Sequence, residues 1–335
     1  MTGKLAAGAR LVGACLTALV AASALPGCSD SSVNNAAAKP AELARYLPED
    51  TEFIQTVDVA QAREELDLPE DANALPTSNR TFPRRNSPEA TLFQVTSRAY
   101  PDVIEAFQAK FNGRGASPLD GSLIRAAAGG AQGVSIVSTA EPIDDIERKL
   151  GLAGYALEGR IYVASERTPD GASRFAGDAG SGRFVFADDP DDALEVLRRI
   201  VTDAKPGHAA EALEPVTGAV RLAVTNRSKK SCVTAFAAAQ EATGEGATLA
   251  LTISRDKPDP ERFDPKPLTG IATGTPTVLV DALIVPVRVK RPLRDGLDAI
   301  TQVTTASDAI EREGRGRPGN LPPLVLPPFE TYDCP

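Results

Sequence analysis

Hydrophobic and polar positions along this chain follow two periods, and together they predict both strands and helices. Glu52–Val59, Thr91–Thr96 and Val278–Val289 are rich in β-branched and aromatic residues over short runs, which is typical of strands. Pro142–Leu150 and Pro190–Val201 instead place apolar residues three and four positions apart, as a helix with one buried face does. The same spacing predicts further helices at Pro101–Phe111 and Pro292–Val303.

One local order recurs: a strand leads into a polar turn and then into a helix that begins at proline with acidic residues in its first turn. Residues 134–201 follow the order β-α-β-β-α, which is part of a ferredoxin-like unit. We therefore predict an α+β body with antiparallel sheets covered by helices, and ferredoxin-like units as its finer form. The likeness of Glu141-Pro142 to Asp189-Pro190 suggests duplication, but proline and acids are favoured at any helix start, so both interpretations stay open.

The longest β-rich run, Val278–Val289, is interrupted by Asp281 and Pro286. Proline removes a donor from a β-ladder, so this run is expected to be an edge strand or to contain a bulge. The run is too short to cross a membrane, for which about 20 apolar residues are needed.

Composition fits a globular chain, since 42% of the 335 residues are hydrophobic and 24% are charged. Tryptophan is absent, so the core must be built mainly from aliphatic residues and alanine. The formal net charge is −9; leaving out Lys4 and Arg10, the only charges among the first 27 residues, takes it to −11. A body this acidic disfavours nucleic acid and anionic headgroups as partners.

The first 28 residues have the three parts of an export signal. Met1–Arg10 is basic, Leu11–Leu25 is apolar and uncharged, and Leu25-Pro26-Gly27-Cys28 follows. The apolar run of 15 residues is shorter than a membrane-spanning helix, and its length and flanks match a secretory signal peptide. The interpretations are a lipoprotein signal, a plain secretory signal with a chance cysteine, and an uncleaved anchor, and we favour the first.

Leu25–Cys28 resembles the bacterial lipobox, in which leucine, a small residue and cysteine occupy positions −3, −1 and +1. Pro26 departs from the small residue usual at −2. The resemblance implies that the Cys28 thiol receives a diacylglyceryl group, that a dedicated peptidase cuts before Cys28, and that the new amino group is acylated. It covers this segment alone; the rest of the chain is similar only in style to uncharacterised actinobacterial envelope lipoproteins.

Two other cysteines, Cys232 and Cys334, would remain in an exported body and are expected to form one disulfide. The alternative, a redox or nucleophilic cysteine, has no CxxC motif and no evident histidine partner. The expected organisation is a signal peptide (1–27), a small polar flexible tether (28–41), an α+β sub-domain (42–204), a second one (205–313), and a Pro-rich tail (314–335) pinned by the disulfide.

Residues with catalytic or metal-binding chemistry form no known motif. His208 is the only histidine, lies in a Pro/Gly segment and is expected to be exposed. The acids from Asp188 to Glu195 are not spaced as in an EF-hand and are interpreted as a solvated helix start. The glycine segments Gly129–Gly133 and Gly177–Gly182 match no nucleotide-binding loop, and the latter is expected to turn one strand into the next. The basic residues Lys229-Lys230 and Arg288–Arg294 are interpreted as solvated.

We therefore expect no catalytic residue, no metal and no cofactor. The leading hypothesis is an exported protein, held by lipid on Cys28 at the outer face of the cytoplasmic membrane, whose body is a non-enzymatic binding module for an envelope protein or a wall component. A carrier of small molecules or lipids is the first alternative and would need an apolar cavity. An enzyme that uses only carboxylates is the second and would need converging acids with shifted pKa values.

Overall fold

The computed structural model describes residues 39–75, 87–99, 119–130, 133–152, 154–164, 175–226, 231–242, 246–254, 257–268, 271–289 and 327–334. By its contacts the chain divides into Met1–Asn34 and Asn35–Pro335, and every described element belongs to the second unit. The predicted export signal with Cys28, and the helices expected at Pro101–Phe111 and Pro292–Val303, lie outside the described residues.

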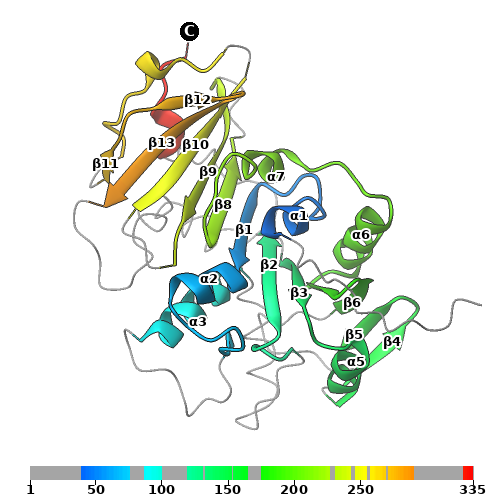
Figure 1. Cartoon of the computed structure of the whole chain (residues 1–335). Coiled ribbons are helices and arrows are strands. Elements are labelled where there is room, and N and C mark those ends of the chain that lie inside the picture. The colour runs from blue at the N-terminus through cyan, green and yellow to red at the C-terminus, as the bar shows by residue number, and fades with distance from the viewer. Residues whose placement is uncertain are drawn as a thin grey trace, which may run out of the picture. The chain divides into compact units, whose positions relative to one another are not determined.

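The described strands join into one 13-stranded sheet (Figure 1). They are β1 (Phe53–Asp58), β2 (Ile124–Gly130), β3 (Val134–Thr139), β4 (Tyr155–Glu158), β5 (Ile161–Ala164), β6 (Phe175–Gly180), β7 (Arg183–Ala187), β8 (Val220–Thr225), β9 (Val233–Gln240), β10 (Gly246–Ile253), β11 (Ile271–Thr273), β12 (Thr277–Leu279) and β13 (Ala282–Val289). The helices are α1 (Pro40–Ala44), α2 (Val59–Glu65), α3 (Pro88–Ala99), α5 (Ile143–Leu152), α6 (Pro190–Val201) and α7 (His208–Ala212), with short 3₁₀ turns η1 (Pro260–Arg262) and η2 (Pro327–Glu330).

The strand order is β11-β13-β10-β9-β8-β1-β2-β3-β7-β6-β5-β4, with β12 also paired to β13. Each pairing within it is antiparallel, so the predicted α+β class with an antiparallel sheet is confirmed at this level, although strands predominate. Ferredoxin-like units are not confirmed, because β3 pairs with β2 and β7 and the segment after α5 turns back as the β4–β5 hairpin. The division at residue 205 stays a prediction; strands from both sides of it share the sheet.

Both faces of the sheet are buried against other elements. The first face packs on α2, α3, α5 and residues 327–334, and the second packs on α1, α6 and α7. Alternation along β9 shows the division: Phe236 and Ala238 belong to the first face, whereas Ala235, Ala237 and Ala239 belong to the second. Because both faces are buried, the sequences of these strands are nearly continuous apolar runs.

Small side chains on the second face let a helix lie close to the sheet. Ala235, Ala237 and Ala239 of β9 are buried with Ala209 and Ala210 of α7. Alanine and glycine have low strand propensity, which explains why the sequence pattern missed both β9 and the Ala-rich β2. Pairing with neighbouring strands and packing against helices (α7 on β9, α1 and α2 on β2), rather than intrinsic preference, make these segments strands.

The strand predicted at Thr91–Thr96 is wrong, because this segment lies within helix α3. Ser87 begins the helix: its Oγ accepts a hydrogen bond from the Ala90 backbone N–H at 3.2 Å, and Pro88 follows it. Serine before proline is a helix-start signal that outweighs the β-like composition of the next residues. Leu92 and Val95 then face the core, three positions apart.

The run predicted as one strand, Val278–Val289, is a tight hairpin of β12 and β13. Leu279 pairs with Ala282, so Val280 and Asp281 form the turn. Strand β13 is not an edge, since it pairs with β10 on one side and with β11 and β12 on the other. Pro286 is accommodated where the neighbouring strand is broken between β11 and β12; there its carbonyl accepts a hydrogen bond from the Gly274 N–H at 2.7 Å.

Val280 has a backbone conformation that disfavours its own side chain. Its φ is +54°, and its side chain is 82% exposed. A β-branched residue in the left-handed region is strained, and exposure leaves little packing to offset the cost.

Val280→Asn is therefore expected to raise the free energy of unfolding by about 1 kcal/mol, because asparagine tolerates this region. Urea denaturation of both proteins measures the change. Val278→Asn is the matched control, since Val278 is also exposed (46%) but has no positive φ. An equal gain in both variants would show that surface polarity, and not backbone strain, is the cause.

A buried arginine holds the loops beside α2. Arg63 is 1% exposed, and its guanidinium donates to the carbonyl oxygens of Ala72 (2.9 Å), Ile124 (2.8 Å) and Gly121 (2.8 Å). A further bond reaches Ser122 O at 3.2 Å. The planar fork of donors suits several carbonyls at once. Arg63 thus ties residues 72 and 121–124 to helix α2.

Candidate functional site

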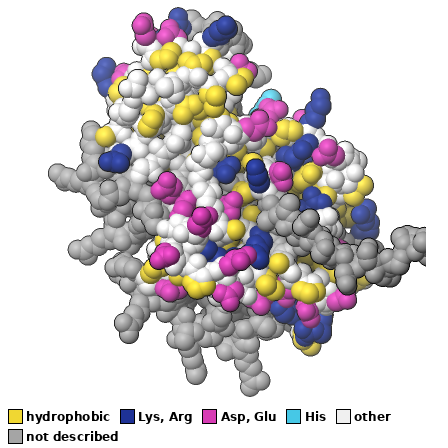
Figure 2. All heavy atoms as spheres, in the orientation of Figure 1, with side chains coloured by type: hydrophobic (Ala, Val, Ile, Leu, Met, Phe, Trp, Pro, Cys, Tyr) yellow, Lys and Arg dark blue, Asp and Glu magenta, His cyan; other side chains and the backbone are white. Residues whose placement is uncertain are grey.

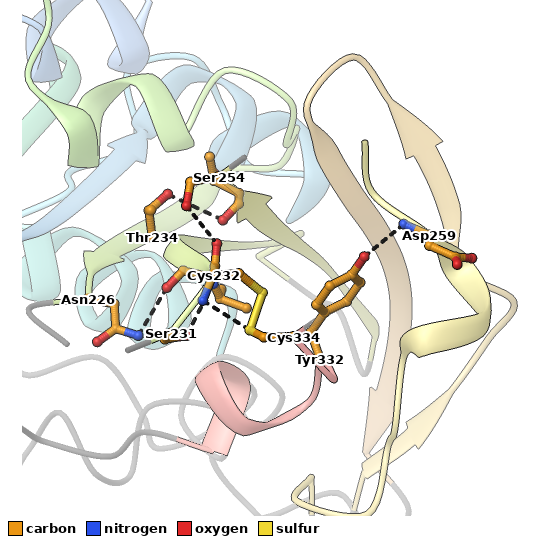
Figure 3. Close-up of a disulfide and its surroundings, with 10 residues drawn as sticks. Asn226, Ser231, Cys232, Thr234, Ser254, Asp259, Tyr332 and Cys334 are labelled. Carbon is orange, nitrogen blue, oxygen red and sulfur yellow. Dashed lines mark hydrogen bonds between the residues drawn. A yellow bond between two sulfur atoms is a disulfide. The ribbon is translucent and has the colours of Figure 1, made fainter. Parts of the chain in front are cut away.

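The cysteines predicted to pair are bonded in the structure (Figure 3). The Cα atoms of Cys232 and Cys334 lie 5.7 Å apart, and the residues are 102 positions apart in sequence. Cys232 immediately precedes β9, and its backbone N–H donates a hydrogen bond to Cys334 Sγ at 2.9 Å. Its carbonyl oxygen accepts from the Ser254 N–H at 2.8 Å, which ties this end of the bridge to the strand after β9.

Residues 327–334, which we call the strap, lie along residues 257–268. Three hydrogen bonds join the two segments: the Asp264 N–H donates to Thr331 O (2.7 Å), the Asp333 N–H donates to Arg262 O (3.0 Å), and the Asp259 N–H donates to the Tyr332 hydroxyl (2.9 Å). The first two of these bonds make Phe263 and Tyr332 partners in an isolated antiparallel bridge. Figure 3 shows the Tyr332 ring reaching from the strap to Asp259.

The strap closes part of the first face of the sheet. The ring of Phe329 meets that of Phe236 edge-on, with centroids 5.1 Å apart. Phe329 and Tyr332 are 8% and 5% exposed and belong to the same apolar cluster as the first-face residues of β9, β10 and β13. Two segments that contain only short 3₁₀ turns and are linked by few hydrogen bonds therefore lie over apolar strands.

Polar contacts shape the surroundings of the bridge. Asn226 Nδ2 donates to Val233 O at 3.0 Å, and Ser254 Oγ donates to Cys232 O at 3.3 Å. The pKa of the Asp264 carboxyl lies below its usual value, because it accepts a hydrogen bond from the Lys266 backbone N–H and faces the Lys266 ammonium at 3.2 Å. Since both cysteines are half-buried, the chemistry that this arrangement offers is thiol–disulfide exchange.

His208 is the first residue of α7, and its side chain is 90% exposed. Its Nδ1 lies 3.4 Å from the Glu211 carboxylate, one helical turn along. The contact is that of a surface pair.

The acids predicted to begin a helix do so. Asp189 is the N-cap of α6, and its carboxylate accepts a hydrogen bond from the Asp191 N–H at 2.8 Å. Within the part of the chain that the structure describes, no group of three or more histidine, cysteine, aspartate or glutamate side chains is placed to hold a metal ion. The pKa of Asp192 is raised, first by burial and then by its acidic neighbours Asp189, Glu195 and Asp50.

Asp192→Asn is expected to stabilise the protein at pH 7 by a few tenths of a kcal/mol, a small gain because the half-buried side chain is partly screened by water. An acid whose pKa is raised on folding makes its full contribution below its unfolded pKa of about 4, and that contribution is lost as pH rises through the folded pKa. The advantage of the asparagine variant should thus vanish in acid. Thermal unfolding at pH 3 and pH 7 measures it, with the exposed Asp144→Asn as control; a gain that persists at pH 3 would contradict the electrostatic cause.

The other sequence candidates lie apart from the strap. Gly180, Ser181 and Gly182 join β6 to β7, and all three have positive φ, so the turn predicted there is confirmed. Gly129 and Gly130 belong to β2, and Gly133 begins the return into β3. Lys229-Lys230 lie outside the described residues; Arg288 lies on β13 and is exposed. On the face drawn in Figure 2, acidic and basic side chains are interspersed with hydrophobic ones.

The chain matches no known protein-family model and no curated protein. Among solved structures it is similar to crystal form III of TP0453, at 11% identity and a TM-score of 0.40, over 77% of this chain and 97% of the other. Crystal form I of the same protein gives 12% identity and a TM-score of 0.40, over 80% and 98%.

None of the helices in the described segments is both long and apolar enough to span a membrane.

Sequence reasoning predicted the bridge but not what it closes. The segment 257–268 contains Asp259-Pro260 and Asp264-Pro265, in which each aspartate accepts a hydrogen bond from the N–H two residues on. These pairs are turn signals and could have indicated an ordered loop. Nothing in their spacing points to the strap more than 60 residues later.

Proposed function

We propose that this chain is an exported lipoprotein, anchored by lipid on Cys28 at the outer face of the cytoplasmic membrane, whose α+β body is a non-enzymatic binding module of the cell envelope. The observation that carries the proposal is the order of a basic start, a 15-residue apolar run and Leu25-Pro26-Gly27-Cys28. The bridge between Cys232 and Cys334 supports an address outside the reducing cytoplasm.

The binding role is supported by the nature of the groups that the chain offers. His208, the only imidazole, pairs with Glu211 at the surface, and no described cluster of three metal-ligating side chains exists. A partner in the envelope, either a protein or a wall component, suits an acidic body held near a membrane by covalent lipid. The alternative function, a small-molecule carrier, is supported by the strap, because the strap overlies apolar strands.

The test is the mass of the protein extracted gently from membranes of its host. The expected mass is that of residues 28–335 plus diacylglyceryl, with or without one further acyl chain, and minus two hydrogens for the bridge. Cys28→Ser removes the acceptor thiol and should leave the protein unlipidated; Cys15→Ser, within the discarded run, is the matched control and should be lipidated normally. An unlipidated wild-type protein in the medium would refute the anchor.

The binding role has its own test. The lipidated protein is cross-linked in intact cells, and its native mass is measured after mild extraction. A discrete macromolecular adduct supports a binding module, whereas a retained small apolar ligand supports the carrier instead. A protein that gives neither would count against both.

A further inference from the structure

We propose that the strap is a redox-released cover: reduction of the Cys232–Cys334 bridge detaches residues 327–334 from the first face of the sheet while the rest of the fold stays intact. The inference goes beyond the proposed function and does not depend on the lipid at Cys28. It rests on how unequally the two ends of the bridge are held, and on what lies beneath the strap.

Cys232 is fixed by the sheet. It precedes β9, which pairs along its length with β8 and β10, and its carbonyl is bonded to the Ser254 N–H. The strap belongs to no strand of that sheet. Among the described residues, it is joined to residues 257–268 by three hydrogen bonds, two of which form the bridge between Phe263 and Tyr332, and it meets β9 through the contact of Phe329 with Phe236. Breaking the sulfur–sulfur bond thus weakens the strap far more than it weakens β9.

The surface beneath the strap is apolar. Phe236, Leu251 and Leu283 are fully buried, and they belong with Phe329 and Tyr332 to one cluster. A strap that swings away would expose part of this cluster to water, since two of its aromatic rings leave with it. An exposed apolar surface of this kind binds apolar molecules or partner segments.

Both sulfurs are accessible enough for exchange, because Cys232 and Cys334 are half-buried. The reductant required is a dithiol. One of its thiolates attacks a sulfur of the bridge, the Cys232–Cys334 bond breaks, and a mixed disulfide forms while the displaced cysteine takes up a proton. The second thiol of the reductant then displaces the remaining cysteine. The protein ends with two thiols and the reductant with one disulfide, a transfer of two electrons and two protons.

The test is hydrogen exchange of the folded full-length protein, oxidised and then reduced with a small dithiol. The amides of Asp259, Asp264 and Asp333 report the strap directly, because each donates a hydrogen bond across its contact with residues 257–268. We expect these amides to exchange about tenfold faster or more after reduction. The amides of Thr139 and Thr202 should be unchanged, since they donate far from the strap, to Gly182 O beside β7 and to Arg198 O at the end of helix α6. An environment-sensitive apolar dye should bind the reduced form alone.

Two variants keep the outcome decisive. Cys232→Ala/Cys334→Ala should behave as the reduced protein without any reductant. Tyr332→Phe removes only the hydroxyl that accepts from Asp259; in its oxidised form it should speed the Asp259 amide alone, which shows that one lost hydrogen bond does not release the strap. Unchanged exchange at Asp264 and Asp333 after reduction would overturn the proposal, since the strap would then be held without the bridge. Equal acceleration at Thr139 and Thr202 would overturn it too, because the bridge would then be a staple of the whole fold.

Discussion

Replacing Arg63 with alanine is expected to lower the free energy of unfolding by about 3–5 kcal/mol. The guanidinium is almost fully buried and satisfies carbonyl oxygens at residues 72, 121, 122 and 124. Removing it takes the guanidinium donors away from these carbonyls, of which Gly121 O keeps a hydrogen bond from the Ala74 N–H, and opens a cavity of side-chain size; each effect is costly on its own. Urea denaturation of the purified variant measures the loss.

Arg125→Ala is the matched control for Arg63. Arg125 lies in strand β2, and its guanidinium pairs with the Glu70 carboxylate at 2.8 Å. The Glu70 side chain is 81% exposed. Exposed pairs contribute at most about 1 kcal/mol, so a small change is expected. Arg63→Lys keeps the charge but not the planar set of donors. Its loss in the free energy of unfolding should therefore lie between those of Arg63→Ala and Arg125→Ala. Similar losses in Arg63→Ala and Arg125→Ala would show that the buried guanidinium of Arg63 contributes little to stability.

Arg63 also shows where sequence reasoning stops. It lies within helix α2, and from sequence alone an arginine is expected to be solvated. Its burial depends on carbonyls of residues 121, 122 and 124, some 60 residues away in sequence, which lie beside α2 where β2 pairs with β1. No local pattern carries that information.

Elements with a strong local signal were predicted closely. Helix α6 has the bounds expected, because Asp189 caps it and Pro190 follows with acids in the first turn. Strands β7 and β8 also have a clear local signal, since their β-branched and aromatic residues match their buried positions. By contrast β9 contains four alanines, a composition that favours a helix, and its pairing with β8 and β10 makes it a strand.

The candidate site, too, was predicted only in part. The pairing of Cys232 with Cys334 followed from their number, because two cysteines left in an exported body have one way to join. The role of Tyr332 and Phe329 in covering β9 did not follow, since aromatic residues near a Pro-rich stretch carry no signal for the surface they meet. Tertiary packing decides which apolar face such a segment covers.

Replacing Phe236 with alanine is the second change expected to have a large effect, a loss of about 3–5 kcal/mol in the free energy of unfolding. Phe236 is fully buried at the centre of the first face, and its ring meets Phe329 at 5.1 Å with an interplanar angle of 65°. The alanine variant loses the transfer energy of the ring and leaves a cavity between β9 and the strap. Leu157→Ala controls for loss of an apolar side chain at the surface, since Leu157 is 59% exposed; it should change stability by less than about 0.5 kcal/mol.

A double-mutant cycle with Phe329→Ala separates the contact from the rest of the loss. Edge-on aromatic pairs are coupled by about 0.5–1.5 kcal/mol beyond the area they bury, so the double variant should lose less than the two single variants together by that amount. The cycle is measured by urea denaturation with the bridge intact, because the strap must be in place for the rings to meet. Additive losses would mean that Phe329 does not rest on Phe236 in solution, and the strap would then have to be held by its bridge and its hydrogen bonds to residues 257–268 alone.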